Sequence, residues 1–588
     1  MTQLVPTVGA WGDTSWSSFA GKMLVILVIA IIHGSRANNI KKCWSLIMIG
    51  QMMNSPLTIT SLMAFGEKIY ANSEIVSVTA DNPLFRYTFA DAFKRTRQLA
   101  NALNTLGAKP GDCIGTLAWN DHRHFELYYG VSCSGMICHT MNPRLFPEQI
   151  DYIINHAEDQ FIFTDILFLP LLESLKDRLS TVKGIIVLTD EAHMPDTSLE
   201  DVYCYETLLA AETDAFSWPE INELDASSLC YTSGTTGNPK GVLYNHRSTV
   251  LHALTGNQPS VMGLGENDAV LPIVPMFHVN AWGIPYGSVI TGSKMVFPGP
   301  KMADGEALTT LINEENVTYS AGVPTIWLAL LDYLKQSGKS IEPLKRVTVG
   351  GAACPLSIME DFDKYGVYTH VGWGMTEMSP LGSYNGELDR EALGEEEFAR
   401  LRVKAGRCIY GVEMKITDED NNEQPWDGEA FGSLKVRGPW ICDSYFKMKD
   451  SDSHDADGWF DTGDVATIDP TGMMQITDRS KDVIKSGGEW ISSIDLENTA
   501  VNHPSVVEAA VIGLYHEKWT ERPLLLVTKQ PGAELSREEM LAWFKGKVAT
   551  WWIPEDCLFV EELPHTATGK LSKKDLREQY KDYRFPTT

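Results

Sequence analysis

Short apolar runs alternate with amphipathic stretches from about Glu74 onward, and this alternation limits the fold more than any other feature of the chain. The runs with the length of buried strands include "CIGTLAWN", "QFIFTD", "GIIVLTD", "RVTVGGAA" and "VYTHVGWG". Stretches with helical character, such as "EQIDYIINHA", lie between them. The order of these segments predicts βαβ units and therefore an α/β fold with layered subdomains.

The pattern changes after about Gly406, where shorter segments such as "GSLKVRGP" are separated by Gly, Pro and Asp. This spacing predicts a small antiparallel β unit. The charged pentapeptide "DRSKD" interrupts it, and a compact α+β module of about a hundred residues follows. We therefore expect an N-terminal extension over residues 1–47, a large domain over 48–478, a hinge over 479–483 and a small domain over 484–588.

The overall charge and the cysteines narrow the class of protein. The 588-residue chain carries 49 Lys and Arg against 77 Asp and Glu, a formal charge of -28. Such a surface repels nucleic acid and anionic lipid, so neither is an expected partner. The ten cysteines include no C-x-x-C pair. They predict reduced thiols and a cytoplasmic location.

One apolar segment, "MLVILVIAII" at residues 23–32, complicates the cytoplasmic prediction. It has about half the length of a membrane span. We interpret it as an extra N-terminal extension, or as the result of a start codon placed too early. Membrane contact through these residues is the alternative. No later segment of the sequence resembles a span.

The stretch "YTSGTTGNPKG" at residues 231–241 has the composition of a phosphate-binding loop. It lacks the Walker spacing, because Pro239 stands where the second glycine should be. Its glycines still allow backbone N–H groups to converge on an anion, and its hydroxyls and Lys240 add donors and charge. The alternative is a flexible linker.

Four later motifs occur in a fixed order after this loop: "GWGMTE" at 372–377, "WFDTGD" at 459–464, "DRSKDVIKSGGEWIS" at 478–492 and "PHTATGK" at 564–570. Together the five motifs resemble the adenylate-forming superfamily of acyl-CoA synthetases, adenylation domains and luciferases. The resemblance runs from about Gln51 to the end of the chain. It implies a large N-terminal domain, a small mobile C-terminal domain, and the use of ATP, Mg²⁺ and CoA.

The resemblance also assigns roles to residues of the nucleotide site. Glu377 is the expected Mg²⁺ ligand, with the hydroxyl of Thr232 as a helper. Trp373 would stack on adenine, and Asp464 would accept hydrogen bonds from both ribose hydroxyls. The full set of expected ATP or AMP contacts is Thr232, Ser233, Gly234, Thr235, Thr236, Gly237, Lys240, Gly350, Gly351, Ala352, Trp373, Gly374, Met375, Thr376, Asp464 and Arg479.

The C-terminal motifs carry the remaining catalytic roles that the resemblance implies. Lys570 would reach the carboxylate and the α-phosphate in the first step and offset their charge. Lys481 is the expected hinge between the adenylating and the thioester-forming arrangements. The residues expected along the route of CoA are Lys485, Gly487, Gly488 and Trp490.

The expected acyl pocket includes His278 and Trp282 of "FHVNAWG". Amino-acid-activating relatives carry an aspartate at the position of His278, so an uncharged acyl group is favoured. Trp282 resembles the gating tryptophan of fatty acyl-CoA synthetases; core packing is the alternative. The wording "MTEMSPLG" is similar to medium-chain enzymes and 3-methylmercaptopropionate-CoA ligases.

The predicted function is an ATP-dependent acid-CoA ligase for a short- or medium-chain fatty acid or 3-methylmercaptopropionate. A long-chain synthetase is the first alternative. A luciferase-like or stand-alone adenylating enzyme is the second, because it would share all five motifs. Family members are commonly homodimers, so the resemblance implies a homodimer here.

Overall fold

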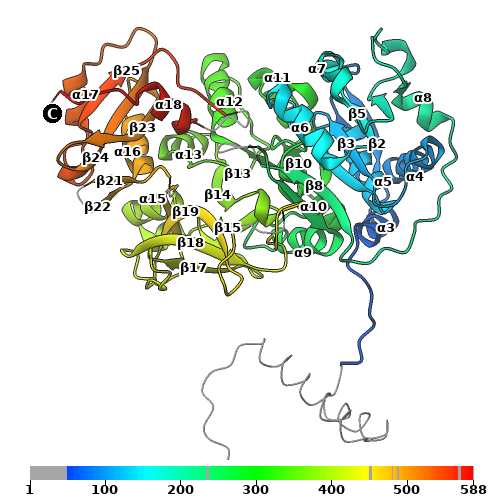
Figure 1. Cartoon of the computed structure of the whole chain (residues 1–588), viewed down its shortest axis with the longest axis horizontal. Helices are drawn as coiled ribbons and strands as arrows, with labels where there is room; N and C mark the ends of the chain where they lie inside the picture. Colours follow the sequence, from blue (N-terminus) through cyan, green and yellow to red (C-terminus); the bar gives the residue numbers. More distant parts are fainter. Residues whose placement is uncertain are drawn as a thin grey trace, which may run out of the picture. The chain divides into compact units, whose positions relative to one another are not determined.

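The computed structural model describes residues 50–232, 238–448, 453–479, 481–486, 489–566 and 571–586. The chain divides into two compact units, Met1–Ser55 and Pro56–Thr588, and every helix and strand given below belongs to the second. Within the described ranges the strands form four sheets (Figure 1). No helix of these ranges is both long enough and apolar enough for a membrane span. Residues 23–32 lie outside the described ranges.

A seven-stranded sheet has the order β7-β6-β5-β3-β4-β8-β9, and its neighbouring strands are parallel except for β8 and β9. Its strands are β3 (Cys113–Leu117), β4 (Ile137–Thr140), β5 (Phe161–Thr164), β6 (Gly184–Val187), β7 (Val202–Cys204), β8 (Ala226–Tyr231) and β9 (Gly241–Asn245). Its helices are α4 (Phe89–Leu106), α5 (His122–Cys133), α6 (Pro147–Ala157), α7 (Leu169–Leu175) and α8 (Tyr205–Ala210).

A nine-stranded sheet has the order β16-β15-β14-β13-β12-β10-β11-β1-β2 and is parallel from β14 to β1. Its strands are β1 (Glu74–Ser77), β2 (Phe85–Thr88), β10 (Ala269–Pro272), β11 (Lys294–Phe297), β12 (Tyr319–Gly322), β13 (Arg346–Val349), β14 (Tyr368–Gly374), β15 (Leu381–Asn385) and β16 (Arg407–Cys408). Its helices are α3 (Ile59–Ile69), α9 (His246–Gly256), α10 (Ile284–Thr291), α11 (Gly305–Glu314), α12 (Pro324–Ser337), α13 (Leu356–Asp363), α14 (Arg390–Leu393) and α15 (Glu395–Arg402).

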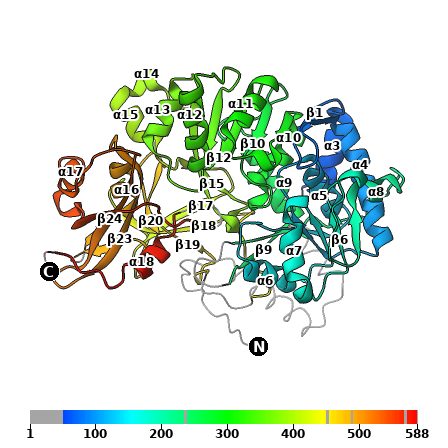
Figure 2. The ribbon, with the colours of Figure 1, turned by 90° about the horizontal axis from the view of Figure 1, so that it is seen from above.

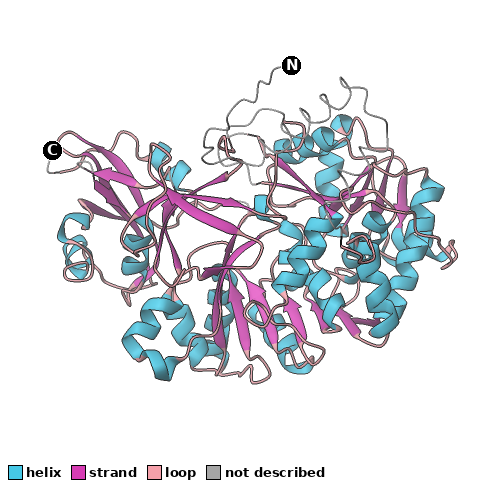
Figure 3. Ribbon diagram, turned by 90° about the horizontal axis from the view of Figure 1, so that it is seen from below, coloured by secondary structure: helices cyan, strands magenta, loops and turns pink. Residues whose placement is uncertain are grey.

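Burial on both faces explains why these strands are continuous apolar runs. In β5, Phe161 and Phe163 belong to the core that the two large sheets share, whereas Ile162 packs with residues of α6 and α7. In β11, Met295 and Val296 divide in the same way between two cores. Helices therefore accompany the parallel strands of both sheets (Figure 3), as a parallel sheet with two buried faces requires.

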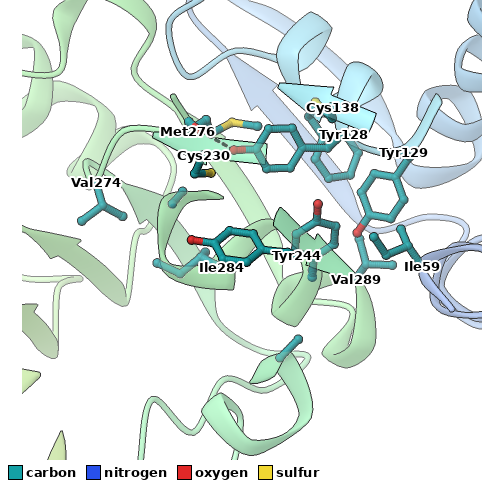
Figure 4. Close-up of a cluster of buried hydrophobic side chains, with 14 of the residues drawn as sticks. Ile59, Tyr128, Tyr129, Cys138, Cys230, Tyr244, Val274, Met276, Ile284 and Val289 are labelled. Atoms are coloured by element: carbon teal, nitrogen blue, oxygen red, sulfur yellow. Dashed lines mark hydrogen bonds between the residues drawn. The ribbon is translucent and has the colours of Figure 1, made fainter. Parts of the chain in front are cut away.

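The core between the large sheets holds several tyrosines (Figure 4). The hydroxyl of Tyr128 donates to the backbone oxygen of Met276, and that of Tyr129 donates to the backbone oxygen of Pro285 across 3.1 Å. The rings of Tyr128 and Tyr286 stack with their centroids 5.7 Å apart. Each of these two hydroxyls of α5 has a backbone acceptor, so the two tyrosines connect the sheets without leaving their own polar groups unsatisfied.

The predicted antiparallel β unit is confirmed. It consists of β17 (Glu413–Thr417), β18 (Phe431–Arg437), β19 (Phe460–Ile468) and β20 (Met474–Arg479), paired in this order. Strand β19 carries the motif "FDTGD", and Asp464 in it pairs with Arg479 of β20. The fold of this unit therefore places two of the predicted nucleotide-site residues next to each other.

The predicted α+β module at the C-terminus is confirmed as well (Figure 2, orange to red). Its sheet has the order β22-β21-β24-β23, with β25 parallel to β24. The elements are β21 (Ile484–Ser486), β22 (Glu489–Ile491), α16 (Ser493–Val501), β23 (Val506–His516), β24 (Thr520–Lys529), α17 (Arg537–Trp543), β25 (Asp556–Phe559) and α18 (Lys573–Gln579). Successive residues of β24, such as Leu524 and Leu525, pack alternately into two separate cores.

The structure thus has the predicted fold class, a large region of layered α/β subdomains with a β unit followed by a small α+β module. Strand β20 ends at Arg479 in one sheet, and β21 begins at Ile484 in another. The mobility of the small module, the hinge and the boundaries between domains stay predictions.

Candidate active site

The predicted phosphate loop joins the antiparallel strands β8 and β9, which pair Tyr231 with Gly241. The backbone N–H of Thr232 donates to the Lys240 oxygen across 2.9 Å, and the Lys240 N–H donates to the Thr232 hydroxyl across 3.1 Å. These two bonds close the loop at its base. Between them, Ser233, Gly234, Thr235, Thr236 and Gly237 lie outside the described residues.

Glu377 lies in a short 3₁₀ turn after β14, and only 5% of it is exposed. Its Oε1 accepts a hydrogen bond from the Tyr445 hydroxyl at 2.7 Å, and its backbone oxygen accepts one from Cys442 N at 2.8 Å. No other hydrogen bond to this carboxylate involves residues that the structure describes. A buried carboxylate with this much unused acceptor capacity fits the hard oxygen ligand that Mg²⁺ requires.

The turn that carries Glu377 is held on both sides. A Cβ at Gly374 would lie 1.9 Å from the Pro380 oxygen, so only glycine fits there. Met375 N donates to that same oxygen across 3.0 Å, and the Thr376 oxygen accepts from the Tyr244 hydroxyl. These residues of the "GWGMTE" motif thus fix the backbone from which Glu377 projects.

Three residues predicted for the nucleotide site meet at one carboxylate. The Trp373 indole donates to Asp464 Oδ2 across 2.9 Å, and Arg479 Nε lies 2.7 Å from Asp464 Oδ1. Asp464 is buried, whereas about half of the Arg479 side chain is exposed. The residues come from three separate motifs, and the structure brings them together.

Trp282, predicted for the acyl pocket, lies against Gly350, predicted for the nucleotide site. A Cβ at Gly350 would lie 2.8 Å from Trp282 Cη2, so the indole rests directly on this glycine. Gly351 follows with φ of +79°, a left-handed conformation that glycine adopts without strain. Ala352 is exposed beside them. Trp282, expected in the acyl pocket, is therefore in contact with Gly350, expected near adenine.

The backbone at Trp282 has an uncommon conformation. Val279, Asn280, Ala281 and Trp282 have φ between +47° and +56°, and Gly283 continues the left-handed turn at +75°. Such a run costs about 1–2 kcal/mol for each residue with a side chain. His278, partly buried, immediately precedes the turn.

Asn280 anchors this left-handed turn and was not predicted from the sequence. Its amide donates to Ser228 Oγ at 3.0 Å, and its side-chain oxygen lies 3.5 Å from Cys230 Sγ. Both partners lie on β8, the strand that leads into the phosphate loop. The signal that was available is the asparagine itself, since Asn tolerates the left-handed region better than other side chains do.

The C-terminal candidates are placed only in part. Lys485 of β21 has its Nζ 3.0 Å from Glu419 Oε1 in the β unit, and Lys481 is exposed between β20 and β21. Trp490 lies in β22, but its side chain is not described. Gly487, Gly488 and Lys570 lie outside the described residues.

The fold and this constellation define the class of protein, an adenylate-forming enzyme. An anthranilate CoA ligase, AuaEII, solved in complex with anthranoyl-AMP, aligns with a TM-score of 0.79 and 24% identity over 90% of this chain and 98% of that chain. ATP-bound MatB from Rhodopseudomonas palustris aligns with a TM-score of 0.75 and 23% identity over 89% and 99%. Both likenesses concern the fold.

Sequence comparison identifies the family. The chain matches "AMP-binding enzyme" over residues 69–446 and "AMP-binding enzyme C-terminal domain" over residues 495–570. It is 50% identical over 537 residues to a 3-methylmercaptopropionyl-CoA ligase of Ruegeria lacuscaerulensis, covering 91% of this chain and 99% of the relative. A medium-chain-fatty-acid-CoA ligase of Ectopseudomonas oleovorans is 48% identical over 91% and 98%. The chain therefore belongs to the AMP-binding enzyme family, and the predicted superfamily is confirmed.

Proposed function

We propose that this protein is an ATP-dependent acid-CoA ligase. It joins a carboxylate to the α-phosphate of ATP, giving an acyl-adenylate and pyrophosphate, and then transfers the acyl group to the CoA thiol, giving acyl-CoA and AMP. The observation that carries the proposal is the convergence of Trp373, Asp464 and Arg479 on one side of the site. Relatives that are 48–50% identical over nearly their whole length are CoA ligases by name, which supports the same reaction.

Each residue of the nucleotide site has a proposed part in binding and orientation. Asp464 holds the ribose hydroxyls, Arg479 contacts the ribose or a phosphate, and Trp373 offers its ring face to adenine. Lys240 and the hydroxyls of the phosphate loop neutralise and orient the phosphates. Glu377, helped by Thr232, would hold Mg²⁺, which supplies positive charge where pyrophosphate leaves.

The acid substrate is the open part of the proposal. His278 replaces the aspartate that would pair with a substrate ammonium, which favours an uncharged acyl chain. We propose a medium-chain fatty acid or 3-methylmercaptopropionate, in keeping with the names of the two relatives. A long-chain acid is the alternative, because a long-chain-fatty-acid-CoA ligase of Thermus thermophilus is 42% identical over 90% of this chain and 97% of that protein.

The second step needs the small domain to change its position. We propose that residues 479–483 act as the hinge, that Lys570 serves the first step, and that Lys485, Gly487, Gly488 and Trp490 line the route of CoA. We also propose that the protein forms a homodimer. For the N-terminus, membrane contact through residues 23–32 remains the alternative to an extension without a membrane role.

One assay tests the reaction and the substrate together. ATP-pyrophosphate exchange is measured with acetate, butyrate, 3-methylmercaptopropionate, octanoate and palmitate, and CoA-dependent AMP formation is then measured with the best acid. We expect ATP-pyrophosphate exchange with at least one acid, and we expect CoA to accept the acyl group of the adenylate formed from that acid. Exchange without CoA transfer, accompanied by oxygen consumption, would favour the luciferase-like alternative, and absence of exchange with all acids would contradict the proposal.

A further inference from the structure

The segment of residues 442–447, here called the clamp, contacts both halves of the proposed phosphate and metal site. At its start, Cys442 N donates to the Glu377 backbone oxygen across 2.8 Å. At its end, Phe446 N donates to the Gly241 oxygen, also across 2.8 Å. The clamp is therefore hydrogen-bonded to the turn of Glu377 and to the last residue of the phosphate loop.

Tyr445 stands between these two anchors and connects the side chains. Its hydroxyl donates to Glu377 Oε1 at 2.7 Å, and the Lys240 ammonium lies 4.6 Å from the centroid of its ring. Only 7% of Tyr445 is exposed. The Tyr445 hydroxyl is therefore a buried donor to the Glu377 carboxylate.

We propose that Tyr445 is a positioning residue that sets Glu377 for Mg²⁺ and Lys240 for the nucleotide phosphates. The inference rests on the proposed function and adds a residue to that site. A glutamate side chain has three rotatable bonds, and a donor at Oε1 limits its rotation and presents Oε2 to a metal. Hydrogen bonds of this kind orient metal ligands and commonly change metal affinity by about 10–100-fold.

The ring of Tyr445 performs the second half of the role. An ammonium over an aromatic face is attracted by the ring quadrupole, so the ring restrains the end of the exposed Lys240 side chain beside the loop. The Tyr445 side chain therefore contacts both the Lys240 ammonium and the Glu377 carboxylate. Under the proposal, the distance between these two groups has to suit the nucleotide phosphates and Mg²⁺. Neither contact is visible in the sequence, because Tyr445 is 68 residues from Glu377.

The test separates the hydroxyl from the ring. Tyr445→Phe removes the donor to Glu377 and keeps the ring, whereas Tyr445→Leu removes both. The matched control is Tyr333→Phe on α12, where a lysine, Lys339, also lies over the ring at 5.4 Å and bonds the hydroxyl, but outside the site. Binding of Mn²⁺ to the protein with ATP is followed by electron paramagnetic resonance, and the Mg²⁺ requirement of ATP-pyrophosphate exchange is measured in parallel.

Tyr445→Phe is expected to weaken Mn²⁺ retention and to raise the half-saturating Mg²⁺ about tenfold, with the KM for the acid unchanged. Tyr445→Leu should in addition raise the KM for ATP, and this further rise should be absent when the substitution is made in a Lys240→Met protein. Wild-type metal dependence in a folded Tyr445→Phe protein, or an equal effect in Tyr333→Phe, would overturn the inference. If wild-type protein shows no exchange but Mn²⁺ with ATP binds and responds to Tyr445→Phe, the proposed reaction fails while the positioning role stands.

Discussion

The Trp373 indole N–H donates to Asp464 Oδ2 across 2.9 Å, although 91 residues separate the two in the sequence. The indole N–H lies in the plane of the ring, so this bond restrains the ring whose face we propose to stack on the base. Asp464 Oδ1 is paired with Arg479 in turn. The proposed adenine, ribose and phosphate contacts are thus one connected unit rather than three independent ones.

The first prediction follows from this shared carboxylate. Asp464→Asn keeps the size of the side chain but removes the charge that pairs with Arg479, and it weakens the acceptor for Trp373. We expect the KM for ATP to rise about tenfold or more, since a hydrogen bond to a charged group contributes about 1.5–3 kcal/mol. Steady-state kinetics of ATP-pyrophosphate exchange measure it. The control is Asp461→Asn in the same strand. The exposed Asp461 carboxylate accepts a hydrogen bond from Gly463 N, and this substitution should leave the KM for ATP unchanged.

The parts of the fold and of the site that could be predicted from the sequence are those that short sequence motifs or segment lengths encode. Asp464, Glu377 and the phosphate loop each lie in a short motif whose residue types are suited to their chemistry. The β unit and the C-terminal module could be read from segment length and spacing. The role of Tyr445 could not be predicted, and for Asn280 the sequence shows only a residue that tolerates the left-handed region. The contacts of both residues depend on partners that are distant in the sequence.

The second prediction concerns the anchor of the left-handed turn before Trp282. Asn280→Gly relieves the positive φ but removes the hydrogen bonds to Ser228 and Cys230. The turn should then move relative to β8, so the KM for the acid should rise about tenfold while the KM for ATP changes little. The same assay with varied acid and varied ATP separates the two effects.

A matched control for that variant is Asn316→Gly. Asn316 also has a positive φ, of +53°, but lies exposed in a turn between α11 and β12. This change should leave both KM values unaltered, because it relieves the backbone without removing a contact of the site. Equal effects of the two substitutions would mean that backbone freedom, and not the anchor, accounts for the kinetics.

The third prediction is a pH dependence of stability at His252. Its Nε2 accepts from Leu381 N at 3.1 Å, and burial lowers the pKa of this histidine from 6.5 to about 4. Because the pKa is depressed in the folded state, the unfolded chain binds the proton first as pH falls below 6.5, and the stability that neutral His252 contributes is lost toward pH 4. The loss amounts to about 3 kcal/mol.

His252→Gln tests this prediction, since glutamine supplies an acceptor near the position of Nε2 but does not titrate. Urea midpoints of the wild type and the variant are compared at pH 7.5 and at pH 4. The variant should be less stable at pH 7.5, and the difference should shrink or reverse at pH 4. Parallel losses in the two proteins would show that His252 does not carry the effect.

The fourth prediction separates the two half-reactions at Lys570. Lys570→Ala should abolish acyl-adenylate formation but leave thioester formation from supplied acyl-adenylate largely intact, because the lysine offsets charge only in the first step. Pyrophosphate exchange and CoA capture of synthetic acyl-adenylate measure the two steps. Lys574→Ala, on the exposed side of α18, should preserve both. Equal loss of both half-reactions in Lys570→Ala would rule out the proposed division of roles.

The fifth prediction concerns the hinge, which is bordered by contacts on both sides. On the N-terminal side of Lys481, Asp478 accepts a hydrogen bond from Ser493 N at 2.7 Å; on its C-terminal side, Asp482 pairs with Arg577 of α18. Lys481→Pro fixes a φ angle that must change when the small domain rotates, so adenylation should persist and CoA transfer should stall. Lys481→Ala, which removes the side chain but keeps the backbone free, should catalyse both steps. Pre-steady-state formation and decay of acyl-adenylate distinguish them, and normal overall turnover in Lys481→Pro would place the hinge elsewhere.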